Sequence, residues 1–343
     1  MYYNLLIFPL LLYLLNLILL KLVFLIDKPS ESFHKIEKKN NIPLSGGLFI
    51  FFCLILLSLI NLRFYVEPKI LFFLSLILIL GIFSDIRSNF SPKGRIIFQL
   101  LIIIFFVVIN KEILINKTNI EILDLLLTSK IGKYLFTIFC IITLLNGFNF
   151  MDGVNGFVSG YILSILAILN LISLKVTGNY YYNDLIYLFF IFFLFNIFGQ
   201  SFLGDNGVYI SSILLSYLVI NLINLNTSIS PIVAVSLLWY PAIENLFTIV
   251  RRLSKKKMTY LPDKLHLHSL IYRRLNINLL KYKNSFSGIL INILLLPNFI
   301  FSYLFYDNSL YLGMIVIMYI TVYLISYSLL IKKFDNNKGK FSE

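Results

Sequence analysis

Between Asn146 and Gly156 the chain carries an unusual run of amides, glycines and one acid, directly after a long apolar segment. The run reads Asn-Gly-Phe-Asn-Phe-Met-Asp-Gly-Val-Asn-Gly. Inside or beside a bilayer, a polar group without a partner is costly, so such a cluster is normally functional. Asp152, the carboxylate of this run, is therefore the first candidate for chemistry.

A second acid, Asp85, stands where another apolar segment ends. The dipole of a helix makes a carboxylate mildly unfavourable at its carboxyl end, so we expect Asp85 to have a cation or a proton as partner. The nearby Ser91-Pro92 pair has a local explanation, because serine caps a helix and proline suits its first position.

A third acid, Asp205, is flanked by glycines in the sequence Gly204-Asp205-Asn206-Gly207. A tight turn would explain these residue types. A turn between two membrane helices does not need a carboxylate, however, and glycines let the backbone approach a phosphate or a metal ion. We favour the ligand-binding interpretation and keep the turn as the alternative.

The hydrophilic segment 251–285 begins with Arg251 and contains Asp263, His266 and His268. The His-x-His spacing is common among zinc ligands, but no cysteine or third histidine lies nearby in the sequence. We therefore favour a role in binding phosphate or sugar hydroxyls.

Two weaker signals complete the candidate residues. A basic segment with His34 leads into Ser45-Gly46-Gly47. Glu244 lies within an apolar segment, about two helical turns before Arg251. An acid within a membrane is a functional candidate by default, and pairing with a basic residue at the same depth is an equally good explanation.

The elements that must position these residues are membrane helices. The chain of 343 residues is 59% hydrophobic and 13% charged, with a mean hydropathy of +0.88, which is typical of an integral membrane protein. Eleven apolar segments are long enough to cross a hydrocarbon core about 30 Å thick. They are 3–26, 44–62, 69–84, 96–110, 131–149, 156–174, 185–202, 207–225, 230–250, 286–306 and 309–331.

We therefore expect an all-α polytopic membrane protein with about eleven spans. Ten is the alternative, because 69–84 and 96–110 are the shortest segments. The whole chain, 1–343, is expected to form one integral-membrane domain that ends in a short polar tail, 332–343.

The basic residues predict the orientation. With eleven spans, 21 of the 29 lysines and arginines fall on one face, which the positive-inside rule makes cytoplasmic. The amino terminus is then outside and the carboxy terminus cytoplasmic. The net charge of +13 mainly reflects this topology, and a nucleic-acid partner is disfavoured because the loops are too short to form a reading surface. All three histidines and the acids Asp85, Asp152, Asp205 and Asp263 fall on the cytoplasmic face.

In their order and spacing these motifs resemble a known family, the polyprenyl-phosphate N-acetylhexosamine-1-phosphate transferases. The resemblance runs from Asp27 to about Leu270. Its motifs are Asp27-x-Pro29…His34 with Pro43-x-x-Gly46-Gly47, Ser91-Pro92-Lys93 after Asp85, Asn146-x-x-Asn149-x-x-Asp152-Gly153, Gly204-Asp205-x-Gly207 and Asp263-x-x-His266-x-His268.

The resemblance implies an enzyme that transfers a sugar-1-phosphate from a UDP-sugar to polyprenyl (undecaprenyl) phosphate and releases UMP, which initiates a cell-surface glycan. It implies Mg²⁺, with Mn²⁺ as the alternative ion, and a location in the cytoplasmic (inner) membrane with the active site on the cytoplasmic face. The implied metal ligands are Asp205 and Asp152. The implied catalytic residues are Asp85, Asp152, His266 and His268. The implied substrate-binding residues are His34, Ser45, Gly46, Asn146, Asn149, Asn155, Asp263 and Arg251.

This chain departs from the family pattern at three places. Ser84-Asp85 stands where family members typically have two adjacent acids, and Ser88-Asn89, with one extra residue before Ser91-Pro92, stands where a third acid follows. Asn155 stands where many members have aspartate. The loss of carboxylates disfavours a site with two metal ions. The alternative function is a transporter or flippase for lipid-linked glycans, in which Asp85, Asp152 and Glu244 bind coupling ions. The sugar, the downstream polymer and a homodimeric assembly stay open.

Overall fold

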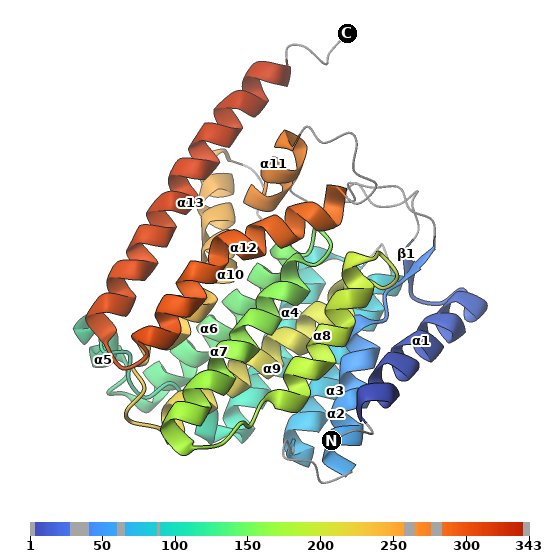
Figure 1. Ribbon diagram of the computed structural model, residues 1–343. Coiled ribbons are helices and arrows are strands. Elements are labelled where there is room, and N and C mark those ends of the chain that lie inside the picture. Colours follow the sequence, from blue (N-terminus) through green and yellow to red (C-terminus); the bar gives the residue numbers. More distant parts are fainter. Residues whose placement is uncertain are drawn as a thin grey trace.

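The computed structural model describes residues 4–27, 41–59, 66–87, 90–256, 265–275 and 283–338. Within these ranges the chain is almost entirely helical (Figure 1). The long helices are α1 (Asn4–Leu22), α2 (Gly46–Leu59), α3 (Pro68–Ile86), α4 (Pro92–Ile109), α6 (Lys130–Met151), α7 (Phe157–Thr177), α8 (Asn183–Ile197), α9 (Gly204–Leu225), α10 (Ile232–Ser254), α12 (Lys283–Leu304) and α13 (Ser309–Lys338).

Each of the eleven apolar segments expected from the sequence coincides with one of these long helices. Eight of them, among the described residues, are long and apolar enough to cross a membrane, namely α3, α4, α6, α7, α9, α10, α12 and α13. The apolar parts of α1, α2 and α8 are shorter. The protein is thus a polytopic helical membrane protein, as predicted.

The short elements were not expected from the sequence. They are the helices α5 (Glu121–Leu126) and α11 (Leu267–Arg274), the 3-10 helix η1 (Lys111–Ile113), and the strands β1 (Ile26–Asp27) and β2 (Ile42–Pro43). The two strands pair antiparallel, with Ile26 opposite Pro43. Helix α13 also continues to Lys338, so the first part of the expected polar tail, 332–343, is helical.

Local capping explains where several helices begin. Ser91 accepts a hydrogen bond from the N–H of Gly94 at 3.1 Å, with Pro92 at the first position of α4, so the predicted cap is confirmed. Ser129 caps α6 in the same way, through the N–H of Gly132 at 2.9 Å. A side-chain cap of this kind satisfies a backbone donor that the helix itself cannot pair.

Helix α9 is central to the bundle and packs against α2, α3, α6, α7 and η1. In the most apolar 18-residue stretch of α9, 67% of the residues are buried, compared with 17% in that of α13. Most of the surface of α13 therefore faces lipid. Gly81 lets α3 approach α9 closely. A Cβ on Gly81 would lie 2.4 Å from the Cα of Asn206, which is too close for any side chain. The carboxyl end of α3 is thereby held against the amino end of α9.

Helix α10 contains a proline that breaks one of its backbone hydrogen bonds. Pro241 has no N–H to donate to the carbonyl of Leu237, four residues earlier. The hydroxyl of Tyr161 on α7 donates to that carbonyl instead, at 2.8 Å. A substitute donor of this kind is needed where water is excluded. The bond also fixes α7 against α10, which carries Glu244 towards the site.

We expect Gly81→Ala to damage both packing and activity. The added methyl group would force α3 and α9 apart, and overpacking of this kind costs about 1–3 kcal/mol. The thermal midpoint in detergent should fall, and substrate turnover should fall with it. Gly313→Ala is the matched control, because a Cβ on Gly313 of α13 meets no heavy atom within 4 Å. A wild-type midpoint for Gly81→Ala would contradict the close packing of α3 on α9.

Candidate functional site at one end of the bundle

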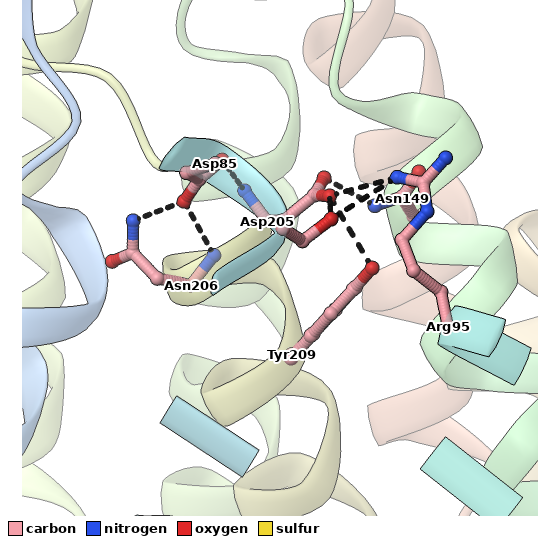
Figure 2. A network of polar contacts seen from close by, with 7 residues as sticks. Asp85, Arg95, Asn149, Asp205, Asn206 and Tyr209 are labelled. Atoms are coloured by element: carbon pink, nitrogen blue, oxygen red, sulfur yellow. Dashed lines mark hydrogen bonds and ion pairs between the residues drawn. The ribbon is translucent and has the colours of Figure 1, made fainter. Parts of the chain in front are cut away.

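The polar residues singled out in the sequence gather where several helices end or begin at the same side of the bundle. The carboxyl ends of α3 and α6 contribute Asp85 and Asn149, and the amino end of α9 contributes Asp205. Glu244 lies in the middle of α10. Figure 2 shows the central network, in which side chains from α3, α4, α6 and α9 converge. Alternating helix directions thus bring residues more than a hundred positions apart into contact.

Asp205, in the first turn of α9, is the hub of this network. One carboxylate oxygen accepts from the amide Nδ2 of Asn149 at 2.8 Å. The other accepts from Arg95 at 3.1 Å, from the hydroxyl of Tyr209 at 3.3 Å and from the hydroxyl of Ser84. The side chain keeps 22% of its surface exposed. It is therefore fixed in orientation and still reachable from outside the protein.

Asp85 is held by the backbone at the start of α9. Its Oδ1 accepts from the N–H of Asp205 at 2.9 Å, and its Oδ2 accepts from the N–H of Asn206 at 3.0 Å (Figure 2). In place of the cation or proton expected from the sequence, the positive end of a neighbouring helix dipole lies beside this carboxylate. Gly204 has φ of +66°, and a Cβ there would lie 2.8 Å from Oδ2 of Asp85, so glycine is required.

The start of α2 is tied to the same end of α9. The side chain of Asn206 donates to the carbonyl of Leu44 at 3.0 Å and accepts from the N–H of Gly47 at 2.7 Å. A Cβ on Gly46 would lie 2.8 Å from the Cα of Leu203, so the two helix ends are in direct contact. Gly46 therefore serves helix packing in this structure. Its proposed role in substrate binding stays a prediction.

Ser45 is completely buried in a polar cluster beside this contact. Its hydroxyl donates to Oδ1 of Asn16 at 2.6 Å and lies 2.5 Å from the hydroxyl of Ser201. The cluster joins α1, α2 and the segment before α9. Ser45 is thus a structural partner of α1 in this conformation, and its role as a substrate ligand stays a prediction.

The 146–156 segment forms the end of α6 and the turn into α7. Asn149 reaches Asp205 directly, whereas Asn146, one turn earlier, donates to the carbonyl of Ile142 at 2.9 Å. Asp152 ends α6 and is exposed. Asp152 therefore lies three residues after Asn149, at the same end of α6 that reaches Asp205.

Asn155 occupies a different environment, against α12. It is buried, its N–H donates to Oδ1 of Asn284 at 2.9 Å, and a Cβ on Gly288 would lie 2.2 Å from its carbonyl oxygen. Its backbone therefore helps to pack α7 on α12. The role of Asn155 in substrate binding stays a prediction.

His266 and His268 stack on each other, with ring centroids 5.6 Å apart. Nδ1 of His266 lies 2.9 Å from Oε1 of Glu244, and Phe150 stacks on the same ring at 5.1 Å. His268 is only 2% exposed, and a Cβ on Gly153 would lie 2.4 Å from its Nε2. Burial, followed by the neighbouring His266, lowers the pKa of His268 to about 3, so this ring is neutral near pH 7. The two histidines thus have distinct environments.

Arg251 lies beside the segment that precedes His266. Its guanidinium donates to the carbonyl of Leu265 at 3.0 Å and to the hydroxyl of Tyr327 at 2.7 Å. This candidate substrate ligand therefore also anchors the chain next to the histidines. His34 and Asp263, which the sequence placed in the same site, lie outside the described residues.

Sequence reasoning assigned no role to several residues of the network, namely Ser84, Arg95, Asn206 and Tyr209. Arg95 follows the predicted cap at Ser91 by one helical turn, so its position at the start of α4 was readable from the sequence. Its ion pair with Asp205 was not, because it joins residues far apart in the chain. The guanidinium places a positive charge directly beside the carboxylate of Asp205.

Asp205 offers carboxylate oxygens, the kind of ligand that a magnesium ion prefers. Within the described residues, no group of three or more histidines, cysteines or acids is placed to hold a metal ion. Mg²⁺ is usually bound through one or two carboxylates, with water and substrate phosphates completing its shell. The hard oxygens of Asp205, with the exposed carboxylate of Asp152 at the same end, fit that pattern for a single ion.

The fold and the site together define a polytopic membrane protein with a polar site at one end of its helical bundle. The family model described as "Glycosyl transferase family 4" matches residues 68–223, from the start of α3 almost to the end of α9. Asp85, Arg95, Asn149, Asp152 and Asp205 all lie within these residues. Over this region the chain is similar to glycosyl transferase family 4, which agrees with the family resemblance noted from its motifs.

Curated relatives agree with this assignment. The chain is 26% identical over 261 residues to the "Probable undecaprenyl-phosphate N-acetylglucosaminyl 1-phosphate transferase" of Bacillus subtilis (strain 168), which covers 71% of this chain and 68% of that protein. It is 28% identical over 265 residues to the "Undecaprenyl-phosphate alpha-N-acetylglucosaminyl 1-phosphate transferase" of Salmonella typhi, covering 73% and 69% respectively. The Salmonella typhimurium (strain LT2) protein of the same description matches equally.

Proposed function

We propose that this protein transfers an N-acetylhexosamine 1-phosphate from a UDP-sugar to undecaprenyl phosphate. The observation that carries the proposal is the coincidence of the family match with the polar network. Residues 68–223 contain the helix ends that bring Asp85, Asn149 and Asp205 together. The relatives are described as undecaprenyl-phosphate N-acetylglucosaminyl 1-phosphate transferases, so N-acetylglucosamine is the first sugar to test.

In the proposed reaction, an oxygen of the lipid phosphate attacks the β-phosphorus of the UDP-sugar. A new phosphorus–oxygen bond forms there, and the bond from the β-phosphorus to the oxygen bridging to the α-phosphorus breaks. The electron pair stays on that oxygen, so UMP leaves. The lipid then carries a diphosphate and the sugar.

The chain's own residues would bring the two anions together and hold them in line. Arg95 supplies a positive charge beside Asp205, and the amide of Asn149 fixes the carboxylate of Asp205 from the other side. Positioning and electrostatic stabilisation dominate phosphoryl transfer, because the protein has little covalent chemistry to perform. Asp85 keeps the amino end of α9, and with it Asp205, at a fixed distance from α3.

Asp205 and Asp152 would hold a Mg²⁺ ion, and Mn²⁺ is the alternative. The bound ion would offset the repulsion between the lipid phosphate and the diphosphate and stabilise the charge on the departing UMP. His266 would contact the diphosphate or the sugar from the segment that precedes α11.

The proposed location is the cytoplasmic (inner) membrane, with the site on the cytoplasmic side. The basic residues support this orientation, since Arg87, Lys93, Arg95, Arg251 and Arg252 all lie at the site's end of the bundle. The polyprenyl chain would run along the apolar surface between helices, where lipid can reach the helix ends. The transporter alternative is not favoured by the comparisons, because the matched relatives are described as transferases.

The direct test of this function is an assay with purified protein in detergent. Undecaprenyl phosphate, UDP-N-acetylglucosamine and Mg²⁺ should yield UMP and a lipid of the mass expected for undecaprenyl-diphospho-N-acetylglucosamine. A panel of UDP-N-acetylhexosamines would then identify the sugar. If no member of the panel releases UMP, while the protein moves lipid-linked glycans across vesicles, the transporter alternative holds instead.

A further inference from the structure

Glu244, an acid of α10, is buried between three separate parts of the chain. It is 1% exposed. Its Oε1 lies 2.9 Å from Nδ1 of His266, and its Oε2 accepts from the hydroxyl of Tyr323 on α13 at 3.1 Å. The sequence left open whether this acid is functional or is only paired with a basic residue. Its partner in the structure, His266, is itself a candidate site residue.

Such a carboxylate determines which ring nitrogen of His266 carries a proton. An acceptor beside Nδ1 keeps the proton on Nδ1, whether the ring is neutral or charged. Nε2, on the opposite side of the ring, is then left for another partner. A buried carboxylate without hydrogen-bonding partners would be strongly destabilising, so Glu244 and His266 depend on each other.

Stacking also fixes the orientation of the plane of the His266 ring. Phe150, at the end of α6, stacks on it at a centroid distance of 5.1 Å, and His268 stacks at 5.6 Å with an interplanar angle of 4°. Stacking limits tilting of the ring, and the bond to Glu244 limits its rotation. Stacking and the bond to Glu244 together fix the direction in which Nε2 points relative to the end of α6.

Helix α13 supports the arrangement at two successive turns. Tyr323 bonds Glu244, and Tyr327, four residues later, bonds Arg251, which in turn donates to the carbonyl of Leu265. Leu265 directly precedes His266. The same face of α13 therefore holds both the acid that orients the ring and the backbone that carries it.

We propose that Glu244 is a positioning residue, which holds the Nδ1–H of His266 so that Nε2 is presented to the phosphate or sugar of the nucleotide-sugar donor. This inference rests on the proposed function for the identity of the donor. The orientation of the ring itself does not depend on it.

The test uses the full-length protein with ¹⁵N-labelled histidine in detergent. The chain has three histidines, so the side-chain spectrum is simple, and a His266→Asn sample assigns the signals. In the wild-type protein Nδ1 of His266 should be protonated. In Glu244→Leu, which removes the acceptor, that proton should be lost from Nδ1 in a substantial fraction of molecules.

The KM for the UDP-sugar should change together with the nitrogen spectrum of His266. Loss of a hydrogen bond to a charged group is expected to raise the KM for the UDP-sugar by about tenfold to a hundredfold, with little change in the KM for the lipid. Glu244→Gln retains a side-chain oxygen as acceptor, so it should keep the Nδ1 proton and show a smaller rise. It also provides a readout should Glu244→Leu fail to fold. Tyr319→Phe is the matched control on α13, one turn before Tyr323, and should behave as wild type.

An unchanged nitrogen spectrum of His266 in Glu244→Leu would overturn the proposal. So would equal KM values for the UDP-sugar in Glu244→Leu and the wild type. If the wild-type protein turned over no UDP-sugar, the proposed function would fail, and the nitrogen spectra would still decide whether Glu244 orients His266.

Discussion

Replacing Asp205 with asparagine or alanine should lower turnover about a thousandfold, the scale expected when an electrostatic contact to the transition state is lost. Asparagine keeps the shape of the side chain and removes its negative charge. Arg95 would then lack its ion-pair partner, and the proposed Mg²⁺ would lose its principal ligand. The initial rate of UMP release at saturating substrates measures the effect.

The matched control for this prediction is Asp124→Asn. Asp124 is also half-buried and hydrogen-bonded, accepting from the N–H of Thr118 at 2.6 Å, but it lies on α5 at the opposite end of the bundle. Its replacement should leave the rate of UMP release close to the wild-type value. A rate for Asp205→Asn within about threefold of wild type would remove Asp205 from the centre of the site.

The second large effect is expected for Asp152→Asn, with a fall in turnover of about a hundredfold. Asp152 is exposed at the end of α6, so its replacement should leave the thermal midpoint unchanged. If the carboxylate helps to hold the ion, the Mg²⁺ concentration that gives half-maximal rate should rise as well. A titration of the rate with Mg²⁺ measures both quantities.

Asp307→Asn serves as the control for Asp152, because Asp307 is likewise exposed, in the turn between α12 and α13 at the other end of the bundle. It should alter neither the rate nor the Mg²⁺ requirement. A reduced rate in Asp152→Asn with an unchanged Mg²⁺ requirement would assign Asp152 to substrate contact alone.

The positions of the long helices could be predicted from the sequence because length and hydropathy decide which segments can cross a membrane. The positions of the short helices α5 and α11 could not be predicted in this way. Helix α11 has eight residues and includes both Ser269 and Arg273, so no apolar stretch marks it. Helix α5 is shorter still.

The site was predictable as a set of residues and not as a set of contacts. Asp85 and Asp205 were recognised separately, each at a helix end, whereas the bonds from Asp85 to the backbone of α9 depend on how closely Gly81 lets α3 approach. Arg95 belongs to the network through an ion pair with Asp205, which lies 110 positions later in the chain. Packing of this kind leaves no periodic pattern in the sequence.

The two histidines show the same limit. Their spacing predicted one motif with a shared role. The structure instead buries His268 against Gly153 and joins His266 to Glu244. The two explanations that the sequence left open for Glu244 are compatible, because the basic partner of this acid is itself a candidate site residue.

The measurement that tests the central claim most directly follows the β-phosphate of the donor. The protein is incubated with undecaprenyl phosphate, Mg²⁺ and UDP-N-acetylglucosamine labelled with ³²P at the β-position. Transfer of a sugar-1-phosphate predicts that the label appears in the lipid fraction, in equal amount to the UMP released. Label that leaves in UDP, with only the sugar on the lipid, would contradict the account.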